Sequence, residues 1–225
     1  MGPNTSSTNR YSPAESKTLL RTMYADVPTT YSRCDVKTGR GQRTINAYQT
    51  VSGEITPEGM DTLFSHVDNM EGGHFVDLGS GSGKVVAYVA LSQPVASSRG
   101  IEIVPERIEA AKMATSAWGN RFVHAAPVLF QKEDMTRISM RIPTHVYTCS
   151  TCFSDDTMNR MIRNVLRGAK VTNTTKYLFS QKQINVEQIN VESNNKVKLY
   201  KTVEHVQVTW NPTNGVTYYI YEVNP

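Results

Sequence analysis

A short run of acid and glycine, from Asp77 to Gly83, contains the residue types best suited to holding a cofactor. The acid closes an apolar run, glycines follow at alternate positions (Gly79, Gly81, Gly83), and an apolar segment resumes at Val85. This order predicts a strand, a tight turn that needs the backbone freedom of glycine, and a helix. Such a turn lets backbone N–H groups and a helix N-terminus approach a ligand closely.

The spacing of the glycines and two nearby acids indicate which ligand this turn would hold. A dinucleotide fingerprint has Gly-x-Gly-x-x-Gly, whereas this chain has Gly-x-Gly-x-Gly. Asp77 suits the ammonium and sulfonium of S-adenosylmethionine and would repel a pyrophosphate. Glu102, 19 residues beyond Gly83, ends the next apolar strand, where a carboxylate can accept ribose hydroxyls. These acids favour S-adenosylmethionine over a dinucleotide, and a glycine turn without a ligand is the remaining alternative.

The elements that must position these residues follow from the spacing of apolar side chains. Strands that alternate with helices predict a parallel sheet with helices on both faces. Two β-rich segments at the end, 198–210 and 215–223, predict an antiparallel hairpin, and the polar stretch 185–195 predicts an exposed loop. The predicted strands are 74–78, 99–103, 127–131, 145–149 and 169–173, and the predicted helices lie within 14–30, from Pro57 with Thr56 as N-cap, and at 84–92, 105–118 and 155–167.

The whole pattern predicts an α/β, Rossmann-like class I methyltransferase fold, with a mostly parallel seven-stranded sheet that ends in an antiparallel hairpin. We expect a basic N-terminal arm over residues 1–45, partly disordered or helical, and a methyltransferase domain over 46–225. The arm holds seven Lys or Arg against three acids, a net +4 that equals the net charge of the whole chain. Such an arm suggests an acidic or nucleic-acid-bearing partner. An ordinary solvated surface is the alternative.

Composition narrows the classes of protein to which the chain could belong. The chain has 225 residues, which is enough for one good core. No apolar run approaches the roughly 20 residues that span a bilayer, so we expect no membrane partner. Three cysteines, an odd and low count, favour a reducing compartment. The Cys149-x-x-Cys152 spacing has no second Cys or His pair to complete a zinc site, so we expect no metal.

Several motifs together resemble one family, the disruptor-of-telomeric-silencing histone methyltransferases, which are non-SET enzymes acting on the globular face of histone H3. Residues 75–86 are similar to the family's cofactor loop, and 53–54 resemble the Gly-Glu motif whose loop covers the methionine end of the cofactor. Residues 100–102 match the strand that ends in the ribose-binding acid, and 133–135 match the acid and apolar residue that grip the adenine. Residues 208–219 resemble the hairpin that walls a lysine channel.

The resemblance covers roughly residues 50–225 and implies an S-adenosylmethionine-dependent histone-lysine N-methyltransferase. It implies a lysine in the globular core of histone H3, on nucleosomes, as the substrate, and a nuclear location. The cofactor-binding residues it implies are Glu54, Ile55, Thr56, Asp77, Gly79, Ser80, Gly81, Gly83, Lys84, Glu102, Ile103, Asp134 and Met135. The catalytic residues it implies are Tyr219, Trp210, Ser150, Thr151 and Phe153.

These catalytic assignments follow from the chemistry of methyl transfer to an amine. The lysine must be neutral to attack, and an apolar channel lowers its pKa. Trp210, Tyr218, Tyr219 and Phe153 are candidate walls, and core packing is their alternative. Because alternate residues of a strand face opposite sides, only one of the two tyrosines can face the channel, and the resemblance favours Tyr219.

The sequence departs from the family at two places. The family has an Asn-Asn-Phe element after its fourth strand, where this chain reads Cys149-Ser150-Thr151-Cys152-Phe153, with Ser150 and Thr151 near the asparagine positions. The hydroxyl side chains of serine and threonine are shorter than the amide side chain of asparagine. The sequence therefore leaves open the shape of the channel mouth and the number of methyl groups that the enzyme adds. Lys84 replaces a neutral polar residue of the family's loop. The alternative to a cofactor-binding role is that Lys84 is a solvated residue in the first turn of a helix.

The expected partners are histone H3 in nucleosomes and nucleosomal DNA, or an acidic histone surface, through the basic arm. Arg160, Arg163 and Arg167 form a second basic stripe on one helix face, although the polar side of an amphipathic helix is the favoured explanation. We expect a monomer. Two alternatives to a histone enzyme remain: a lysine methyltransferase for a non-histone protein, and a chromatin-binding module with a vestigial cofactor pocket.

Overall fold

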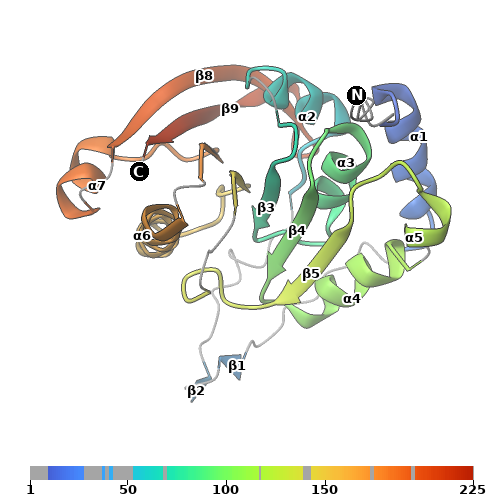
Figure 1. Cartoon of the computed structure of the whole chain (residues 1–225), viewed down its shortest axis with the longest axis horizontal. Coiled ribbons are helices and arrows are strands. Elements are labelled where there is room, and N and C mark those ends of the chain that lie inside the picture. Colours follow the sequence, from blue (N-terminus) through green and yellow to red (C-terminus); the bar gives the residue numbers. More distant parts are fainter. Residues whose placement is uncertain are drawn as a thin grey trace, which may run out of the picture.

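The computed structural model describes residues 10–27, 37–38, 41–42, 53–67, 70–116, 118–138, 143–172, 175–193 and 196–224. A seven-stranded sheet with the order β5-β4-β3-β6-β7-β9-β8 forms the centre of the fold (Figure 1). Its strands are β3 (His74–Leu78), β4 (Ser97–Glu102), β5 (Val128–Lys132), β6 (His145–Thr148), β7 (Tyr177–Ser180), β8 (Lys196–Val208) and β9 (Asn211–Asn224).

The pairing of these strands confirms the predicted fold class. The strands from β5 to β7 pair in parallel, with β3 between β4 and β6. Strand β9 then pairs antiparallel with β7 and with β8, which closes the sheet with a long hairpin. A separate antiparallel pair, β1 (Lys37–Thr38) and β2 (Gly41–Gln42), lies outside this sheet.

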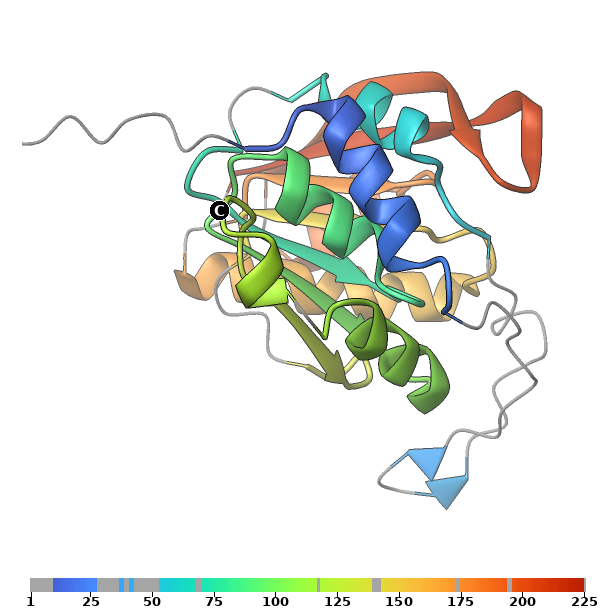
Figure 2. The same ribbon diagram turned by 90° about the vertical axis from the view of Figure 1, so that its right-hand side faces the viewer.

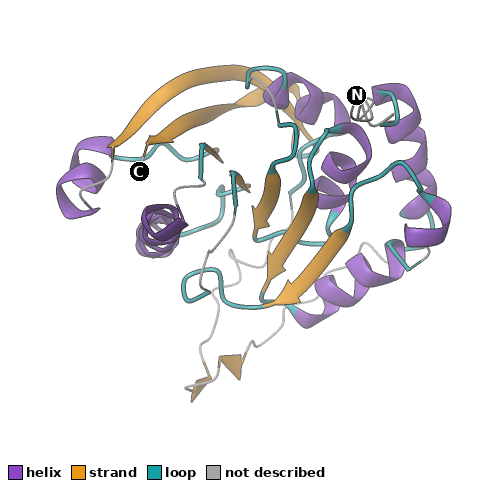
Figure 3. Cartoon of the chain, in the orientation of Figure 1, coloured by secondary structure: helices purple, strands orange, loops and turns teal. Residues whose placement is uncertain are grey.

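Helices cover both faces of the sheet, as Figure 3 shows by colour. One face carries the first five helices and the other carries α6 and α7, each over its own apolar core (Figure 1). The described residues hold no helix that is both long and apolar enough to cross a bilayer. The helices are α1 (Pro13–Met23), α2 (Pro57–Phe64), α3 (Lys84–Ser92), α4 (Pro105–Ala114), α5 (Trp118–Arg121), α6 (Asp155–Thr172) and α7 (Val186–Ser193).

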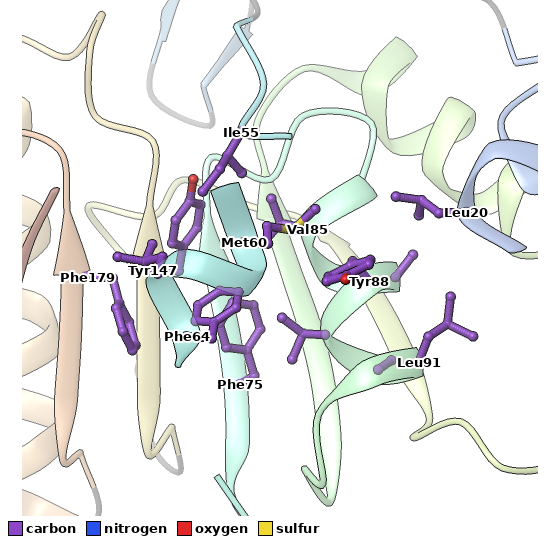
Figure 4. Close-up of a cluster of buried hydrophobic side chains, with 14 of the residues drawn as sticks. Leu20, Ile55, Met60, Phe64, Phe75, Val85, Tyr88, Leu91, Tyr147 and Phe179 are labelled. Atoms are coloured by element: carbon purple, nitrogen blue, oxygen red, sulfur yellow. The ribbon is translucent and has the colours of Figure 1, made fainter. Parts of the chain in front are cut away.

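Helix α3 is the most deeply buried helix of the first face. All seven residues from Val85 to Leu91 are buried, because the sheet lies on one side of the helix and α1 on the other. Beside it, the ring of Phe64 meets Phe75 and Phe179 edge-to-face, with centroids 5.7 and 5.3 Å apart (Figure 4). This packing fixes α2 and α3 on β3, the strand whose end carries Asp77.

The predicted N-terminal arm contains a helix that belongs to the folded body. Ser12 caps α1 in a capping box with Glu15. Leu20, Tyr24 and Val27 are buried in the same core as α2 and α3. Figure 2 shows α1 lying along α3. The predicted division between residues 45 and 46 falls outside the described residues.

Two predictions of secondary structure after residue 168 were wrong. Helix α6 continues to Thr172, over residues predicted as the strand 169–173, because buried Ala169 extends the apolar stripe of Met161 and Val165, and the strand forms at β7 instead. The predicted loop 185–195 contains α7, which buries Ile189 against the sheet. In addition, α4 ends at Ala114, earlier than the predicted 118, and α5 follows.

Candidate functional site

A cavity of about 320 Å³ lies where the carboxyl ends of β3, β4 and β6 meet. The sheet order changes direction here, since the chain places β4 on one side of β3 and β6 on the other, and open α/β sheets bind ligands at such a point. The volume is within the range of small-molecule sites. The predicted site residues that line the cavity are Glu54, Ile55, Asp77, Gly79, Ser80, Gly81, Lys84, Glu102, Ile103, Asp134, Met135 and Phe153.

The glycine loop between β3 and α3 has the left-handed backbone that its sequence predicts. Gly79, Gly81 and Gly83 have φ angles of 82°, 54° and 82°. A Cβ atom at Gly79 would lie 2.7 Å from the Phe153 ring, so a larger residue would be strained and would also collide. The N–H groups of Gly79 and Ser80 both donate to the Ile101 carbonyl, which ties the loop to β4.

Asp77, the last residue but one of β3, lines the cavity with one unsatisfied carboxylate oxygen. Its side chain is 2% exposed, and its Oδ1 atom has no hydrogen-bond donor within the described part of the chain. Burial, and then the charge of Glu102, raise the pKa of Asp77 well above its usual range. The buried hydroxyl of Ser80 also lacks a partner among the described residues. Buried polar atoms without partners at a cavity indicate a ligand that supplies hydrogen bonds and, for Asp77, positive charge.

Glu102 ends β4 and is held rigidly by the backbone. Its Oε1 atom accepts from the N–H groups of Ile103 and Val104 at 2.8 and 2.9 Å, and Oε2 accepts from Gly81 N–H at 2.9 Å. The guanidinium of Arg107 lies 3.8 Å from Oε2. Each carboxylate oxygen has two lone pairs, so Oε1 is saturated by its two N–H donors, and Oε2 retains capacity to accept one ligand hydroxyl from the cavity.

A lid segment, residues 53–56, covers one side of the cavity and is bound to the end of β8. The Thr56 N–H donates to Gln207 O at 3.0 Å, and the Thr209 N–H donates to Glu54 O at 2.9 Å. The Thr209 hydroxyl accepts from the Glu54 N–H at 3.1 Å. Through these bonds the terminal hairpin positions the lid.

Two charged residues join the lid to the glycine loop. The Lys84 ammonium donates to Glu54 Oε2 at 2.6 Å, and the Ser82 hydroxyl donates to Glu54 Oε1 at 3.1 Å. Lys84 is therefore paired with an acid at the cavity, and the alternative of a purely solvated residue does not describe it.

The far end of the cavity has an apolar and an acidic side. Met135 and Ile103 line it. Asp134 follows β5, and its Oδ1 atom accepts from the N–H and hydroxyl of Thr136 at 2.9 and 2.7 Å. Such a slot, flat apolar walls with a carboxylate at the edge, suits a heteroaromatic ring that carries an amino group.

The opposite end is lined by two residues that the sequence analysis did not assign, Tyr147 and Cys149. The hydroxyls of Tyr147 and Tyr218 lie 2.7 Å apart and their rings stack with centroids 5.8 Å apart. Burial raises the pKa of both phenols, and it raises the pKa of the Cys149 thiol to about 11. The Cys149 thiol also lies 3.8 Å from the Gly53 carbonyl. This end is therefore neutral, aromatic and enclosed.

The residues predicted to be catalytic fall in different places. Phe153 lines the cavity, and Trp210, 39% exposed, lies over Gly53 of the lid, where it would collide with any Cβ. Ser150 is fully buried and bonds to Ser180 Oγ and Lys182 N–H, which is a structural role. Thr151 is exposed and donates to Gln181.

Neither tyrosine of the pair lines the cavity directly: Tyr218 contacts Tyr147 of its wall, whereas Tyr219 packs on the other core, so the choice of Tyr219 made from the resemblance stays a prediction. Tyr219 packs against the core beneath α6 and α7, where its ring lies 6.5 Å from that of Tyr221. Tyr218 is completely buried on the Tyr147 side. Alternation along β6 puts Tyr147 and Cys149 on one face, and that was the available signal for them. Thr56 and Gly83 also lie outside the lining, as the N-caps of α2 and α3.

The described residues contain no group of three or more His, Cys, Asp or Glu side chains arranged to hold a metal ion. Cys149 and Cys152 are both free thiols in the structure.

Comparison with known proteins identifies relatives by sequence. The family model described as "Histone methylation protein DOT1" matches residues 40–223. One curated relative, the histone-lysine N-methyltransferase, H3 lysine-79 specific, of Eremothecium gossypii, is 26% identical over 211 residues. The alignment covers 86% of this chain but only 36% of that protein, so the chain spans about a third of the relative's length.

Comparison of structures confirms the fold and leaves the substrate open. A phosphoethanolamine N-methyltransferase from Haemonchus contortus has a TM-score of 0.53 at 11% identity, covering 95% of this chain and 49% of its own. A magnesium protoporphyrin IX methyltransferase from Synechocystis has a TM-score of 0.52 at 16% identity, covering 93% and 96%. A putative RNA methyltransferase from Pyrococcus horikoshii also has 0.52, at 11% identity, covering 92% and 97%. Their named substrates differ, so the shared fold does not determine the acceptor.

Proposed function

The chain belongs to the DOT1 histone-methylation family, and from this premise we propose that it is an S-adenosylmethionine-dependent protein-lysine N-methyltransferase that acts on histone H3. The observation that carries the proposal is the pair of acids at the cavity: Asp77, whose Oδ1 atom has no partner among the described residues, and Glu102, fixed by three backbone N–H groups. The first supports a cationic amino-acid end of a ligand, and the second, through the free acceptor site of its Oε2 atom, supports a ribose hydroxyl.

The described residues fit this cofactor along the whole cavity. Asp77 and the glycine loop would hold the methionine end, Glu102 the ribose, and Asp134 with Met135 the adenine. S-adenosylmethionine supplies a methyl group on a sulfonium, which is a good leaving group. The chain then has to align the acceptor amine, exclude water and keep the amine neutral.

Tyr147, Tyr218 and Cys149 are suited to these tasks at the acceptor end. Their buried hydroxyl and thiol groups are neutral, since burial raises the pKa of each. A lysine that enters this enclosed end loses hydration, which lowers its pKa from about 10.4 and frees the attacking lone pair. Aromatic faces accept both the entering ammonium and the methylated product. Trp210, over the lid, would form the outer wall.

We further propose that the substrate is a lysine in the globular core of H3 within nucleosomes. The enzyme would then act in the nucleus. The named activity of the Eremothecium gossypii relative supports it, although that protein is nearly three times as long as the matched part. The net charge of +4 on residues 1–45 supports contact with nucleosomal DNA or an acidic histone surface. In the described part of the arm, Arg10 binds backbone carbonyls and Lys17 pairs with acids of α2, so any DNA contact would fall to other residues.

A specific observation keeps the non-histone alternative in view. Residues 149–153 stand where the family has its Asn-Asn-Phe element, with Ser150 and Thr151 near the asparagine positions, so the acceptor end differs in shape and polarity from the family pattern. A different acceptor end would accept a lysine with different neighbouring residues in the substrate protein.

Methyl transfer with tritium-labelled cofactor tests the proposal. Recombinant nucleosomes, free core histones and a lysate of the source cells are the acceptors, and mass spectrometry maps the labelled residue. We expect label on H3 in nucleosomes. Gly79→Arg is the matched control, because its side chain would fill the space at Phe153 and prevent cofactor binding. Label on another protein would favour the non-histone alternative, and no label with any acceptor would contradict the proposed activity.

A further inference from the structure

Four residues behind the cavity form a closed cycle of contacts, which we call the latch: Tyr24, Ser82, Glu54 and Lys84. The Tyr24 hydroxyl donates to the Ser82 carbonyl at 2.9 Å, in a buried position. The Ser82 hydroxyl and the Lys84 ammonium both donate to the Glu54 carboxylate. The Lys84 ammonium lies 5.5 Å from the centroid of the Tyr24 ring, which completes the cycle.

The latch joins four separate parts of the site. Glu54 belongs to the lid, Ser82 to the glycine loop, Lys84 to the first turn of α3, and Tyr24 to the end of α1. Glu54 and Lys84 line the cavity, whereas Tyr24 does not. Any effect of Tyr24 on a ligand is therefore indirect, and the latch joins Tyr24 to two residues that line the cavity.

Tyr24 comes from a helix outside residues 40–223, the part that matches the family model. That helix is fixed at its far end, where the Arg10 guanidinium donates to the carbonyls of His124 and Val95 at 2.8 and 2.9 Å. Along its length, Leu20 is buried against α3 (Figure 4). Helix α1 thus presents Tyr24 to the glycine loop from a rigid support.

We propose that Tyr24 is a positioning residue of the cofactor site, and that α1 holds the lid against the glycine loop through the latch. That the ligand is S-adenosylmethionine rests on the proposed function. That α1 holds the lid against the glycine loop is a claim about the chain without any ligand. Without the Tyr24 hydroxyl, the Ser82 carbonyl loses its buried donor, the loop and lid separate more often, and the binding-competent population falls.

Tyr24→Phe tests this claim, because it keeps the aromatic ring under Lys84 and removes only the donor. We expect the Kd for S-adenosylhomocysteine, measured by calorimetry, to rise about three- to tenfold. In the free chain, we expect faster amide hydrogen exchange at residues 53–56. Arg10→Met is the control, because it loosens the far end of α1 and leaves all four latch residues in place. We expect it to lower Tm without changing the Kd or the exchange of the lid.

Unchanged exchange of the lid in Tyr24→Phe overturns the proposal, and so does an equal rise in Kd for Arg10→Met, which would mean that only general stability matters. If the wild-type chain does not bind S-adenosylhomocysteine, the proposed function fails. The exchange measurement on the free chain still decides the role of Tyr24 in that case.

Discussion

At the scale of single residues, the acids of the site were predictable and the acceptor end was not. Asp77 and Glu102 each close an apolar strand, and the ends of neighbouring parallel strands meet, so sequence order alone brings them together. The choice between Tyr218 and Tyr219 depends on which face of β9 packs on Tyr147. That register is set by long-range pairing with β7 and β8, and no local pattern reports it.

Asp77→Asn should stabilise the free chain and weaken cofactor binding. Because burial raises the pKa of Asp77, the native state keeps a proton that the unfolded chain releases above a pKa of about 3.9. The free energy of unfolding therefore falls as the pH rises from that value through the raised native pKa. The neutral amide removes this loss, so we expect a higher Tm at neutral pH, by about 2–4 °C for each kcal/mol relieved.

The same variant should bind S-adenosylmethionine roughly 10- to 100-fold more weakly in calorimetry, since a charge-assisted hydrogen bond contributes about 1.5–3 kcal/mol. Thermal scans of both proteins between mildly acidic and neutral pH provide the control. The wild-type Tm should lose more over this range than that of the variant. Equal affinity of the two proteins would remove Asp77 from the site.

Tyr218→Phe should reduce turnover far more than Tyr219→Phe. The first change removes the hydroxyl that contacts Tyr147, whereas Tyr219 lies on the other core. We expect kcat to fall about tenfold or more for Tyr218→Phe, with S-adenosylhomocysteine affinity within about threefold of wild type. Steady-state kinetics with both variants make the comparison. A larger loss of kcat in Tyr219→Phe would support the assignment suggested by the family resemblance.

At the scale of elements, the strand–helix alternation around the glycine loop was correct, and the errors lie where tertiary contacts decide. Residues 169–173 contain β-branched side chains that favour a strand, yet α6 continues because Ala169 packs with Val165 on the sheet. Helix α7 is polar overall, and its position depends on Asn190, whose side chain bonds both the N–H and the carbonyl of Val197. Such distant partners are not visible in a sequence window.

The N-cap of α2 gives a test at this scale, because Thr56 both caps the helix and binds β8. Its hydroxyl accepts from Gly59 N–H at 3.1 Å and donates to Gln207 O at 3.3 Å. We expect Thr56→Ala to lower the free energy of unfolding by about 1 kcal/mol and to raise the Kd for S-adenosylhomocysteine, since the lid loses an anchor. Thr62→Ala, in the same helix, removes only an exposed bond to Glu58 O and is the matched control. An equal Kd for the two variants would argue against the anchoring role.

At the scale of the whole molecule, the charge of +4 on residues 1–45 predicts how the chain should respond to salt. If basic residues contact nucleosomal DNA, methylation of nucleosomes should fall about tenfold or more between roughly 50 and 200 mM salt. The affinity for S-adenosylhomocysteine should change little, because the protein carboxylates that would bind it, Asp77 and Glu102, are buried and salt screens buried charges less. Initial rates and calorimetry over the same salt series measure both. A flat rate on nucleosomes would show that phosphate contacts do not drive docking.

A co-crystal structure with S-adenosylhomocysteine tests the central claim most directly. We predict that the nucleoside lies across the carboxyl ends of β3 and β4, with a ribose hydroxyl on the Oε2 atom of Glu102 and the amino group within hydrogen-bond distance of Asp77. The adenine should lie between Ile103 and Met135. Two results would contradict the account. One is a cavity without electron density for the nucleoside at a saturating concentration of the ligand, and the other is a phosphate-bridged nucleotide bound in its place.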